Sequence, residues 1–485
     1  MRLRVFDMSF VSLEFIFIFF PLCVGGYYLC PERFRNIFLL MASLIFYGAG
    51  EPRRIYVLIL SIVINYVFGL LIARSRGRLR LFVLTAALIS NAGFLFVYKM
   101  LIFRYGSANV TMPLGLSFFT FRTVSYCLDV YWDMAPVNKS LPETALYISF
   151  FPQISMGPIS RYKDFVKDMG KRGFDRISFY GGIRRIITGL FKKLIIADSL
   201  LPAINASFGM EASERSVSLA WLGLTAYLIQ LYFDFMGYTD IAVGIGGLFG
   251  FTLPENFDYP YAAPSVTEFW NRWHITLGAW ARDYIYMPVF RACQGKKLAR
   301  LACYLPASLA VWVFIGIWHG LGSDNPLVFI VHGLYYFVLI AFERVISDRK
   351  KAKRKKLGLK KQPQTLASKI SWHVYAFIAI LFGQLLFNCK SMGQYGDYVL
   401  DLFGLKGNPA AQAETWYYLR QNALPLILGI VFSVPVVPYA ARKLKEAGKE
   451  KVISCLSPVV YLVMLVVSIA FAFTSTYKSF VYFRF

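Results

Sequence analysis

Apolar residues occur along this chain in long continuous runs, and short polar or basic segments separate the runs. A helix needs roughly 20 mainly apolar residues to cross a bilayer, whereas a barrel strand would alternate apolar and polar residues. The pattern therefore predicts an all-α polytopic membrane protein with about ten to twelve spans, and it argues against a β-barrel. The runs that are long enough, or nearly so, are Phe10–Tyr28, Ile37–Tyr47, Ile55–Ile72, Leu81–Phe103, Val217–Phe233, Leu301–Trp318, Pro326–Phe342, Val374–Phe387, Leu424–Val437 and Ile453–Phe473.

The middle of the chain, from Pro113 to Pro288, has a different pattern, because Gly, Pro, Asp, Asn and Arg interrupt its apolar stretches. Polar or non-helical backbone at membrane depth persists only where it is buried in protein or lines a cavity. We therefore predict that the functional site lies in this region together with the later segment Gly316–Gly320, which reads GIWHG.

A helix is predicted from Ser265 towards Met287. Ser265 or Thr267 can act as its N-cap, and Glu268 adds negative charge to its first turn. The basic residues around this segment and its tryptophans indicate an amphipathic helix low in the membrane, near the cytoplasmic side.

The organisation of the chain predicts a single membrane domain over residues 1–485, because no repeat of 20 to 50 residues is visible. Within it we distinguish N-terminal spans (1–104), a core that holds the site (112–345), a basic loop (346–365) and C-terminal spans (370–485).

Charge refines the topology. The net charge of +25 would suggest nucleic acid as the partner of a soluble protein, but 57% of the 485 residues are hydrophobic and the basic residues cluster between spans. The positive-inside rule then places the clusters Asp348–Gln362 and Ala441–Lys451 in the cytoplasm, with both termini outside. The first apolar run lacks a small-residue cleavage site, so we expect a retained span, with Met8 as an alternative start to Met1.

Cysteines and glycines give no sign of metal or phosphate binding. The seven cysteines are scattered without a CxxC pair, which predicts small buried hydrophobic side chains and no metal site. The sequence GIGGLFG from Gly244 follows no strand and precedes no Lys-Ser/Thr pair, so we interpret it as close helix packing.

The four histidines are the first candidates for chemistry. His319 ends an apolar run, where an ionisable side chain needs a partner or a cavity; it is either a general base that takes a proton from a hydroxyl or a structural histidine bonded to a carbonyl. His274 is the second candidate, with Asn271 three residues earlier on the same helical face, although interfacial hydrogen bonding would also explain it. His332 is predicted to be structural and His373 interfacial.

Asp234 and Asp240 are two carboxylates in an apolar setting. They could form a proton relay or bind a metal, but no His-carboxylate spacing supplies enough metal ligands. We favour ion pairs with Arg272 or Arg282.

Several motifs together resemble the membrane-bound O-acyltransferase superfamily, in particular its bacterial branch that acylates exported polymers. They occur in that family's order and span almost the whole chain: PLGLSFFTFRTVSY, FFPQISMGPISRY, YFDFMGYTDIAVGIGGLFGFTLPENFDYPY, EFWNRWHITLGAWARDYIYMP, GIWHG and SFVYFRF.

The resemblance implies a helical fold with re-entrant or interfacial helices around a central funnel that opens to each side. It also implies that His319 is the catalytic histidine at a narrow neck and that His274 is a second histidine nearer the cytoplasm. Asn271, Trp318, Asp234 and Tyr238 are further candidates for substrate binding. An acyl thioester is the expected donor substrate, with no cofactor.

Two polymer branches are similar to the chain. FWNRWH is the form associated with teichoic-acid D-alanylation, whereas the length, the spans past Asp397 and the FVYFRF ending favour alginate-type polysaccharide O-acetylation. We therefore expect acetyl-CoA as donor and an exported polysaccharide as acceptor, reached directly or through an exported SGNH-type partner. A transporter would also have broken helices and intramembrane Asp, but the inverted repeats typical of transporters are not visible; a non-catalytic scaffold is the third alternative.

Overall fold

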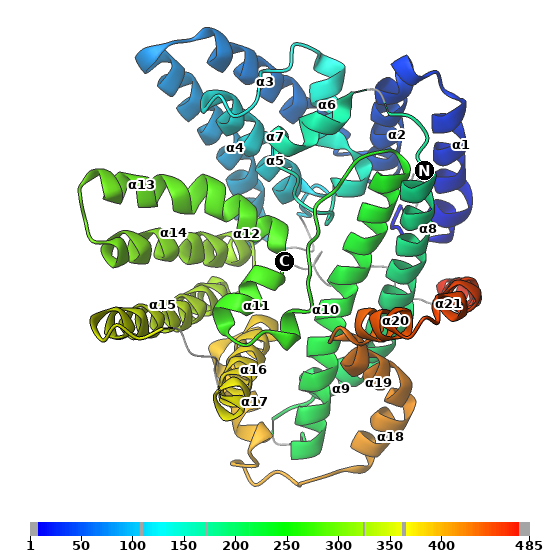
Figure 1. Ribbon diagram of the computed structural model, residues 1–485, viewed down its shortest axis with the longest axis vertical. Coiled ribbons are helices and arrows are strands. Elements are labelled where there is room, and N and C mark those ends of the chain that lie inside the picture. The colour runs from blue at the N-terminus through cyan, green and yellow to red at the C-terminus, as the bar shows by residue number, and fades with distance from the viewer. Residues whose placement is uncertain are drawn as a thin grey trace. The chain divides into compact units, whose positions relative to one another are not determined.

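The computed structural model describes residues 8–106, 110–170, 172–212, 214–323, 325–360 and 365–474 (Figure 1). The SFVYFRF motif, both termini and the last two residues of the basic cluster Asp348–Gln362 lie outside the described residues. The choice between Met1 and Met8 and the placement of both termini therefore stay predictions.

The fold is all-α, as predicted, and the one β-type pairing among the described residues is an isolated bridge between Phe257 and Trp273. Each of the ten predicted runs is helical over most of its length. Seven helices in the described part of the chain are long and apolar enough to cross a membrane, or eight if the helix pair Ala423–Phe432 and Val436–Glu446, bent by 62°, forms one span.

The described residues thus hold seven or eight helices that could span, fewer than the ten to twelve spans predicted, because some apolar runs form shorter helices. Phe15–Leu29 is an apolar helix below span length, and the run after Phe34 gives a helix of 16 residues. The bend at 62° follows from Pro435, since proline cannot donate a backbone hydrogen bond and disfavours helix at the preceding residue.

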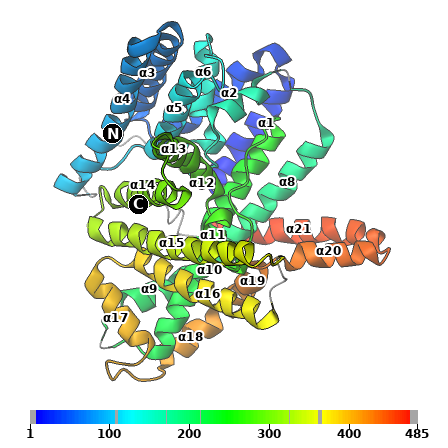
Figure 2. The same cartoon turned by 60° about the vertical axis from the view of Figure 1, so that its left-hand side comes forward.

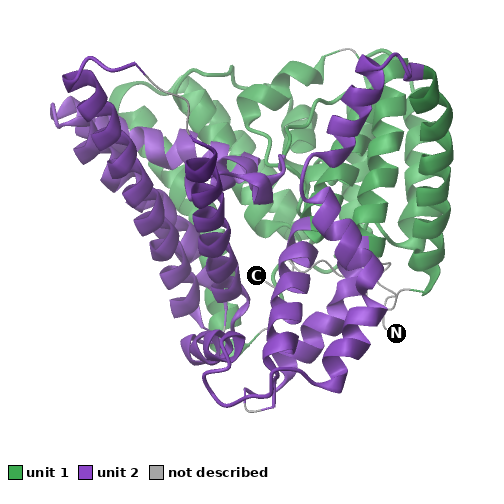
Figure 3. Ribbon diagram, turned by 60° about the horizontal axis from the view of Figure 1, so that its bottom comes forward, with its two compact units in different colours: residues 1–195, 233–255, 451–484 green, residues 196–232, 256–450, 485 purple. Residues whose placement is uncertain are grey.

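The chain divides into two compact units, each assembled from separate segments (Figure 3). The first comprises the described residues of 1–195, 233–255 and 451–484, and the second those of 196–232 and 256–450. Whether the chain acts as one domain over 1–485 stays a prediction. The helices of the first unit are α1 (Phe20–Leu29), α2 (Arg35–Gly50), α3 (Ile55–Arg74), α4 (Gly77–Tyr105), α5 (Leu116–Tyr131), α6 (Leu141–Ser149), α7 (Tyr162–Phe165), α8 (Arg176–Phe191), the second half of α10 (Val217–Leu248) and nearly all of α21 (Glu450–Thr474).

The second unit carries most of the candidate residues. Its helices are α9 (Leu201–Gly209), the first half of α10, α11 (Val266–Arg272), α12 (Ile275–Ala281), α13 (Met287–Gly295), α14 (Arg300–Gly320), α15 (Pro326–Lys356), α16 (Leu366–Asn388), α17 (Met392–Leu402), α18 (Ala413–Gln421), α19 (Ala423–Phe432) and α20 (Val436–Glu446).

In the first unit, α8 and α10 approach each other at paired glycines. A Cβ built on Gly244 would lie 2.7 Å from the carbonyl oxygen of Gly182, and one built on Gly189 would lie 2.6 Å from that of Gly237. Only hydrogen fits at such distances, so the interpretation of the glycine-rich stretch from Gly244 as close helix packing is confirmed.

In the second unit, α14 and α15 form a tight hairpin, and both views show them side by side (Figures 1 and 2). A Cβ on Gly316 would lie 2.9 Å from the Phe329 carbonyl oxygen, and one on Gly333 would lie 2.5 Å from that of Trp312. Gly316, three residues before His319, therefore allows the close approach of the α15 backbone.

The helix predicted from Ser265 to Met287 is wrong as one continuous element. Ser265 caps α11 as expected, its hydroxyl accepting from the Glu268 amide at 3.1 Å, but α11 ends at Arg272. His274 adopts a left-handed conformation with φ of 46°, which breaks the helix before α12 starts at Ile275.

All seven cysteines are free. Burial is confirmed for Cys23, Cys127, Cys303 and Cys389, whereas Cys30 and Cys293 are partly exposed and Cys455 is exposed.

Candidate functional site

His319 is the penultimate residue of α14 and is buried, with 7% of its surface exposed. Three aromatic rings surround its imidazole: Trp318 at 4.3 Å, Phe387 of α16 at 5.2 Å and Phe329 of α15 at 6.0 Å between ring centroids. Aromatic walls exclude water, which strengthens any electrostatic interaction the imidazole makes and suits proton transfer.

A second histidine shares one of these walls. The His332 ring on α15 lies 5.1 Å from Phe387, so Phe387 contacts both His319 and His332. His332 also lies 4.9 Å from the Tyr336 ring and 6.5 Å from the Trp270 ring of α11. The sequence predicted a structural role for His332, which stays a prediction, and the fold places His332 in the same aromatic cluster as His319.

This cluster contains buried polar atoms without a hydrogen-bond partner anywhere in the described chain: the indole nitrogen of Trp270, Nε2 of His332 and the hydroxyl of Tyr336. The Trp270 and Tyr336 rings are 4.8 Å apart, so the three atoms belong to one continuous group. Leaving a buried donor or acceptor unpaired costs about 1 to 3 kcal/mol each. Three in one place indicate a site whose polar partner is a ligand or water.

Glu343 fixes the position of Trp270. Its buried carboxylate on α15 accepts hydrogen bonds from the Val266 amide at 2.7 Å and the Thr267 amide at 2.9 Å, which ties the start of α11 to α15. A carboxylate at a helix N-terminus satisfies free amides and is favoured by the helix dipole. Glu343 was not predicted from the sequence, although an acidic residue directly after an apolar run indicates such a bond.

His274 lies in a different network, at the break between α11 and α12. Its Nδ1 is 3.0 Å from Oδ1 of Asn256, an oxygen that also accepts from the Thr276 amide at 3.2 Å and the Thr276 hydroxyl at 3.0 Å. Because Oδ1 accepts in all three bonds, Nδ1 carries the proton and donates it. Burial lowers the pKa of His274 to about 3, so the ring is neutral at physiological pH.

The shared helical face of Asn271 and His274 is wrong, because the helix ends between them. Asn271 is exposed and donates to Glu268 at 3.2 Å, whereas His274 turns inward to Asn256. Asn256 was not predicted from the sequence. The only signal for it was that it lies in one of the family-like motifs, within the letters PENFDYP.

Asp234 and Asp240 lie in the first unit and form ion pairs, but the predicted partners Arg272 and Arg282 are wrong. Asp234 pairs with Lys193 at 2.5 Å, and Asp240 pairs with Lys192 at 2.6 Å and with Arg185 at 2.9 Å. The arginines pair instead with acidic neighbours in their own segments, Arg272 with Glu268 and Arg282 with Asp283, because these lie within four residues along the chain.

Tyr238, also in the first unit, bonds to the hydroxyl of Ser155 and stacks on Phe10 at 4.7 Å. His373 is exposed on α16 and donates to the Lys369 carbonyl at 2.8 Å. The roles of Asp234, Tyr238, Asn271 and Trp318 in substrate binding, and of His319 and His274 in catalysis, stay predictions.

The chain matches known proteins over the region that holds these residues. Residues 135–360 match the model of MBOAT, the membrane-bound O-acyltransferase family. A probable alginate O-acetylase AlgI of Azotobacter vinelandii is 33% identical over 404 residues, covering 79% of this chain and 76% of the relative. This chain belongs to the membrane-bound O-acyltransferase family.

The names of two other relatives state a different acceptor or a different transferred group. A peptidoglycan O-acetyltransferase of Helicobacter pylori is 27% identical over 541 residues, covering 100% of this chain and 98% of the relative. A teichoic acid D-alanyltransferase of Bacillus subtilis is 33% identical over 283 residues, covering 56% of this chain and 69% of the relative. Its family, these relatives and its long apolar helices show that the chain is a multi-pass membrane protein and an O-acyltransferase.

Proposed function

We propose that this O-acyltransferase moves an acetyl group from acetyl-CoA in the cytoplasm to hydroxyl groups of an exported polysaccharide. The observation that carries the proposal is the buried His319, enclosed by three aromatic rings at the end of α14 that lies away from the basic end of α15. The acetylases among the relatives support acetyl as the transferred group, because they align with 79% and 100% of this chain.

His319 acts as the general base in this proposal. Its imidazole takes the proton of the acceptor hydroxyl, the oxygen attacks the thioester carbonyl carbon, and a C–O bond forms while the C–S bond breaks. The same proton then passes from the imidazolium to the departing thiolate, so the products are the acetyl ester and CoA as a thiol. General base catalysis of this kind contributes roughly 100-fold to 10,000-fold in rate.

The unpaired atoms of Trp270, His332 and Tyr336 suit the donor side of the reaction. His332 and Tyr336 lie further along α15 towards its basic end than Pro326, which lies beside Gly320, and the Trp270 ring of α11 lies next to both of them. A thioester arm carries amide groups that can bond to an indole N–H, an imidazole nitrogen and a phenol. Donor entering from the cytoplasmic face would meet them before it reached His319.

The acceptor is proposed to lie on the opposite face, with transfer to it either direct or through an exported SGNH-type partner. The positive-inside rule supports the sidedness, because the basic end of α15 is expected in the cytoplasm. The cytoplasmic membrane is the location this topology implies.

Sealed vesicles with a defined orientation test the proposal. Acetyl-CoA supplied on the face with the basic loops should acetylate polysaccharide on the other face and release CoA on the donor side. His319→Ala should lower the rate at least about 100-fold, while His373→Ala, which removes an exposed histidine, leaves it unchanged. Transfer that continues in His319→Ala, or donor that works only from the opposite face, would contradict it.

D-Alanyl transfer to teichoic acid is the second candidate, favoured by the 33% identity to the Bacillus subtilis D-alanyltransferase. Offering the chain either acetyl-CoA or a D-alanyl carrier protein separates the two, because only the correct donor should be consumed in a manner that depends on His319.

A further inference from the structure

Gln384 is the one polar side chain in the stretch Ile380–Phe387 of α16. It is buried, with 2% of its surface exposed, and its side-chain nitrogen Nε2 has no hydrogen-bond partner among the described residues. That nitrogen carries two N–H donors, and a buried donor without an acceptor lowers stability. Leucine or methionine would fill the same space without this cost, so the amide is a candidate for function.

Buried amides that join helices have a different environment in this protein. Asn65 of α3 and Asn91 of α4 are 1% and 3% exposed, and each donates to the side-chain oxygen of the other, at 3.0 Å and 2.7 Å. Amides satisfied in this way contribute to helix packing. The Gln384 nitrogen has no such neighbour in the described chain, which indicates that its acceptor is a ligand or water.

The turn of α16 that carries Gln384 lies beside the imidazole of His319. Phe387 comes three residues after Gln384, on the same side of the helix, and its ring lies 5.2 Å from that of His319. Along the helix axis Gln384 precedes Phe387 by about 4.5 Å, towards the basic cluster that comes before α16. In the proposed topology this is the side from which the donor arrives.

Contacts with α15 fix the position of this turn. The Tyr335 hydroxyl donates to the Ala379 carbonyl at 2.8 Å, and the Tyr336 hydroxyl lies so close to Gly383 that a Cβ there would clash with it. The Tyr336 hydroxyl is one of the groups proposed above to bond to the thioester arm. Gln384, the residue after Gly383, therefore lies next to the place proposed for that arm.

The transfer reaction needs a hydrogen-bond donor at this place. When the acceptor oxygen bonds to the thioester carbon, the electron pair of the carbonyl π bond moves onto the carbonyl oxygen, which becomes negative. When the C=O bond re-forms, the C–S bond breaks and the thiolate takes the proton that the His319 imidazolium holds. The histidine moves the proton but does not stabilise the negative oxygen, whereas N–H groups aimed at that oxygen in a water-excluded site do so.

We propose that the side-chain N–H of Gln384 donates to the thioester carbonyl oxygen and stabilises the oxyanion that forms during transfer. This makes Gln384 a second catalytic residue, and the inference rests on the proposed function for the role of His319. A neutral amide suits the position, because it leaves no uncompensated charge in the protein interior between turnovers.

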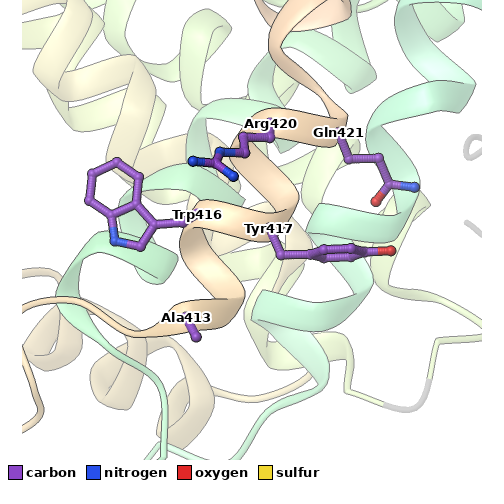
Figure 4. A pocket seen from close by; sticks show the side chains of 5 residues that line it. All are labelled: Ala413, Trp416, Tyr417, Arg420 and Gln421. Carbon is purple, nitrogen blue, oxygen red and sulfur yellow. The ribbon is translucent and has the colours of Figure 1, made fainter.

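Kinetics of the full chain in nanodiscs, with whichever of the two candidate thioester donors the wild type consumes, test the proposal. Gln384→Met keeps a side chain of similar length and removes both N–H groups. It should lower kcat about 100-fold to 1,000-fold, as the loss of one oxyanion donor does, and leave the donor KM within about twofold. Gln421→Met makes the same change at an exposed glutamine that lines an open hollow on α18 (Figure 4), and it should change neither constant.

Infrared spectra provide a second measurement that does not depend on turnover. The probe is a ketone analogue of the donor, with CH2 in place of the thioester sulfur and carbon-13 in its carbonyl group. A hydrogen bond from a donor held in a dry site lowers the carbonyl stretching frequency below its value in water. We expect this lower frequency in wild type and in His319→Ala, and a higher one in Gln384→Met.

A smaller loss of kcat in Gln384→Met would overturn the proposal, and so would a loss that accompanies a fall in melting temperature as large as that of Asn91→Leu. A carbonyl frequency in wild type at or above the value in water would overturn it without the use of any variant. Full activity in His319→Ala would contradict the proposed function alone, whereas full activity in Gln384→Met with none in His319→Ala would contradict this inference alone.

Discussion

Two buried polar regions of this protein differ in how their polar groups are satisfied. Between α10 and the segment just after α8 in the first unit, the charges are paired: Lys193 pairs with Asp234 at 2.5 Å, and only 0% and 1% of the two side chains are exposed. Between α11 and α15 of the second unit, Trp270, His332 and Tyr336 keep polar atoms that no described residue satisfies. A buried polar residue alone does not mark a site, since both regions have them.

The difference separates a structural role from a ligand-binding one. Charges buried as pairs hold helices together, and removing one partner leaves the other uncompensated. Unpaired neutral groups cost stability when nothing bonds to them, so they indicate a site whose polar partner is a ligand or water. We therefore expect substitutions in the first region to change stability and those in the second to change catalysis.

Breaking the buried ion pair should have the largest effect on stability. Asp234→Ala removes the carboxylate that pairs with the buried Lys193, and losing one partner of such a pair costs about 3 to 5 kcal/mol. The amount of folded protein that survives detergent extraction and its melting temperature would measure the loss.

Two controls accompany this prediction. The double substitution Lys193→Met with Asp234→Leu should recover most of the stability, because neither charge remains. Asp397→Ala breaks an exposed pair with Lys406 and should cost no more than about 1 kcal/mol. Equal losses in Asp234→Ala and Asp397→Ala would remove the distinction between buried and exposed pairs.

His274 represents an intermediate case, a neutral group satisfied by hydrogen bonds. Burial lowers its pKa to about 3 in the folded chain, below the unfolded value near 6.5. The unfolded state therefore binds the proton more tightly, and stability that is complete above pH 6.5 declines as the pH falls below it. At pH 5 this linkage amounts to about 2 kcal/mol.

Melting temperatures at pH 7.5 and pH 5 would measure this loss in wild type and in His274→Gln. The wild type should lose more stability on acidification than the variant, since glutamine does not titrate. Identical losses in the two proteins would show that other groups set the acid sensitivity.

Removing an unpaired hydroxyl should leave the fold intact and affect the donor. Tyr336→Phe deletes a buried hydroxyl with no described partner, so the melting temperature should stay within the error of measurement. If that hydroxyl bonds to the thioester arm, the donor KM should rise up to about tenfold, the equivalent of one hydrogen bond.

Tyr398→Phe is the matched control, because Tyr398 is equally buried but bonded to the Ser207 hydroxyl at 2.8 Å and the Ala220 carbonyl at 2.9 Å. It should lower the melting temperature and leave the donor KM unchanged. The opposite result, with Tyr336→Phe destabilised and its KM unaltered, would show that Tyr336 is structural.

The sequence predicted the helices better than their contacts. Apolar runs fix where helices form, and the glycine-rich stretch from Gly244 predicted close packing, because both signals are local. The break at His274 was missed, since the left-handed turn depends on bonds from Asn256, a residue 18 positions earlier.

The sequence also did not predict which residues pair with each other in the fold. The ion pairs of Asp234 and Asp240 were predicted as a class, but the choice of Lys193, Lys192 and Arg185 depends on how α8 lies against α10. His332 belongs to the same aromatic cluster as His319 because the ring of Phe387, 55 positions after His332, contacts both histidines. Short-range patterns carry no information on such pairings.

The smallest expected effect comes from Asn271, and it tests which asparagine supports His274. Asn271 is exposed and bonds only weakly to Glu268 at 3.2 Å, whereas Asn256 is buried and holds both His274 and Thr276. Asn256→Ala should therefore reproduce the loss of acyl transfer that His274→Ala causes, while Asn271→Ala changes the rate by less than about twofold, as surface substitutions usually stay within 0.5 kcal/mol. Steady-state rates of the three variants, with expression as the check on folding, measure the difference. A larger loss in Asn271→Ala than in Asn256→Ala would return Asn271 to the role of substrate-binding residue that its sequence position first indicated.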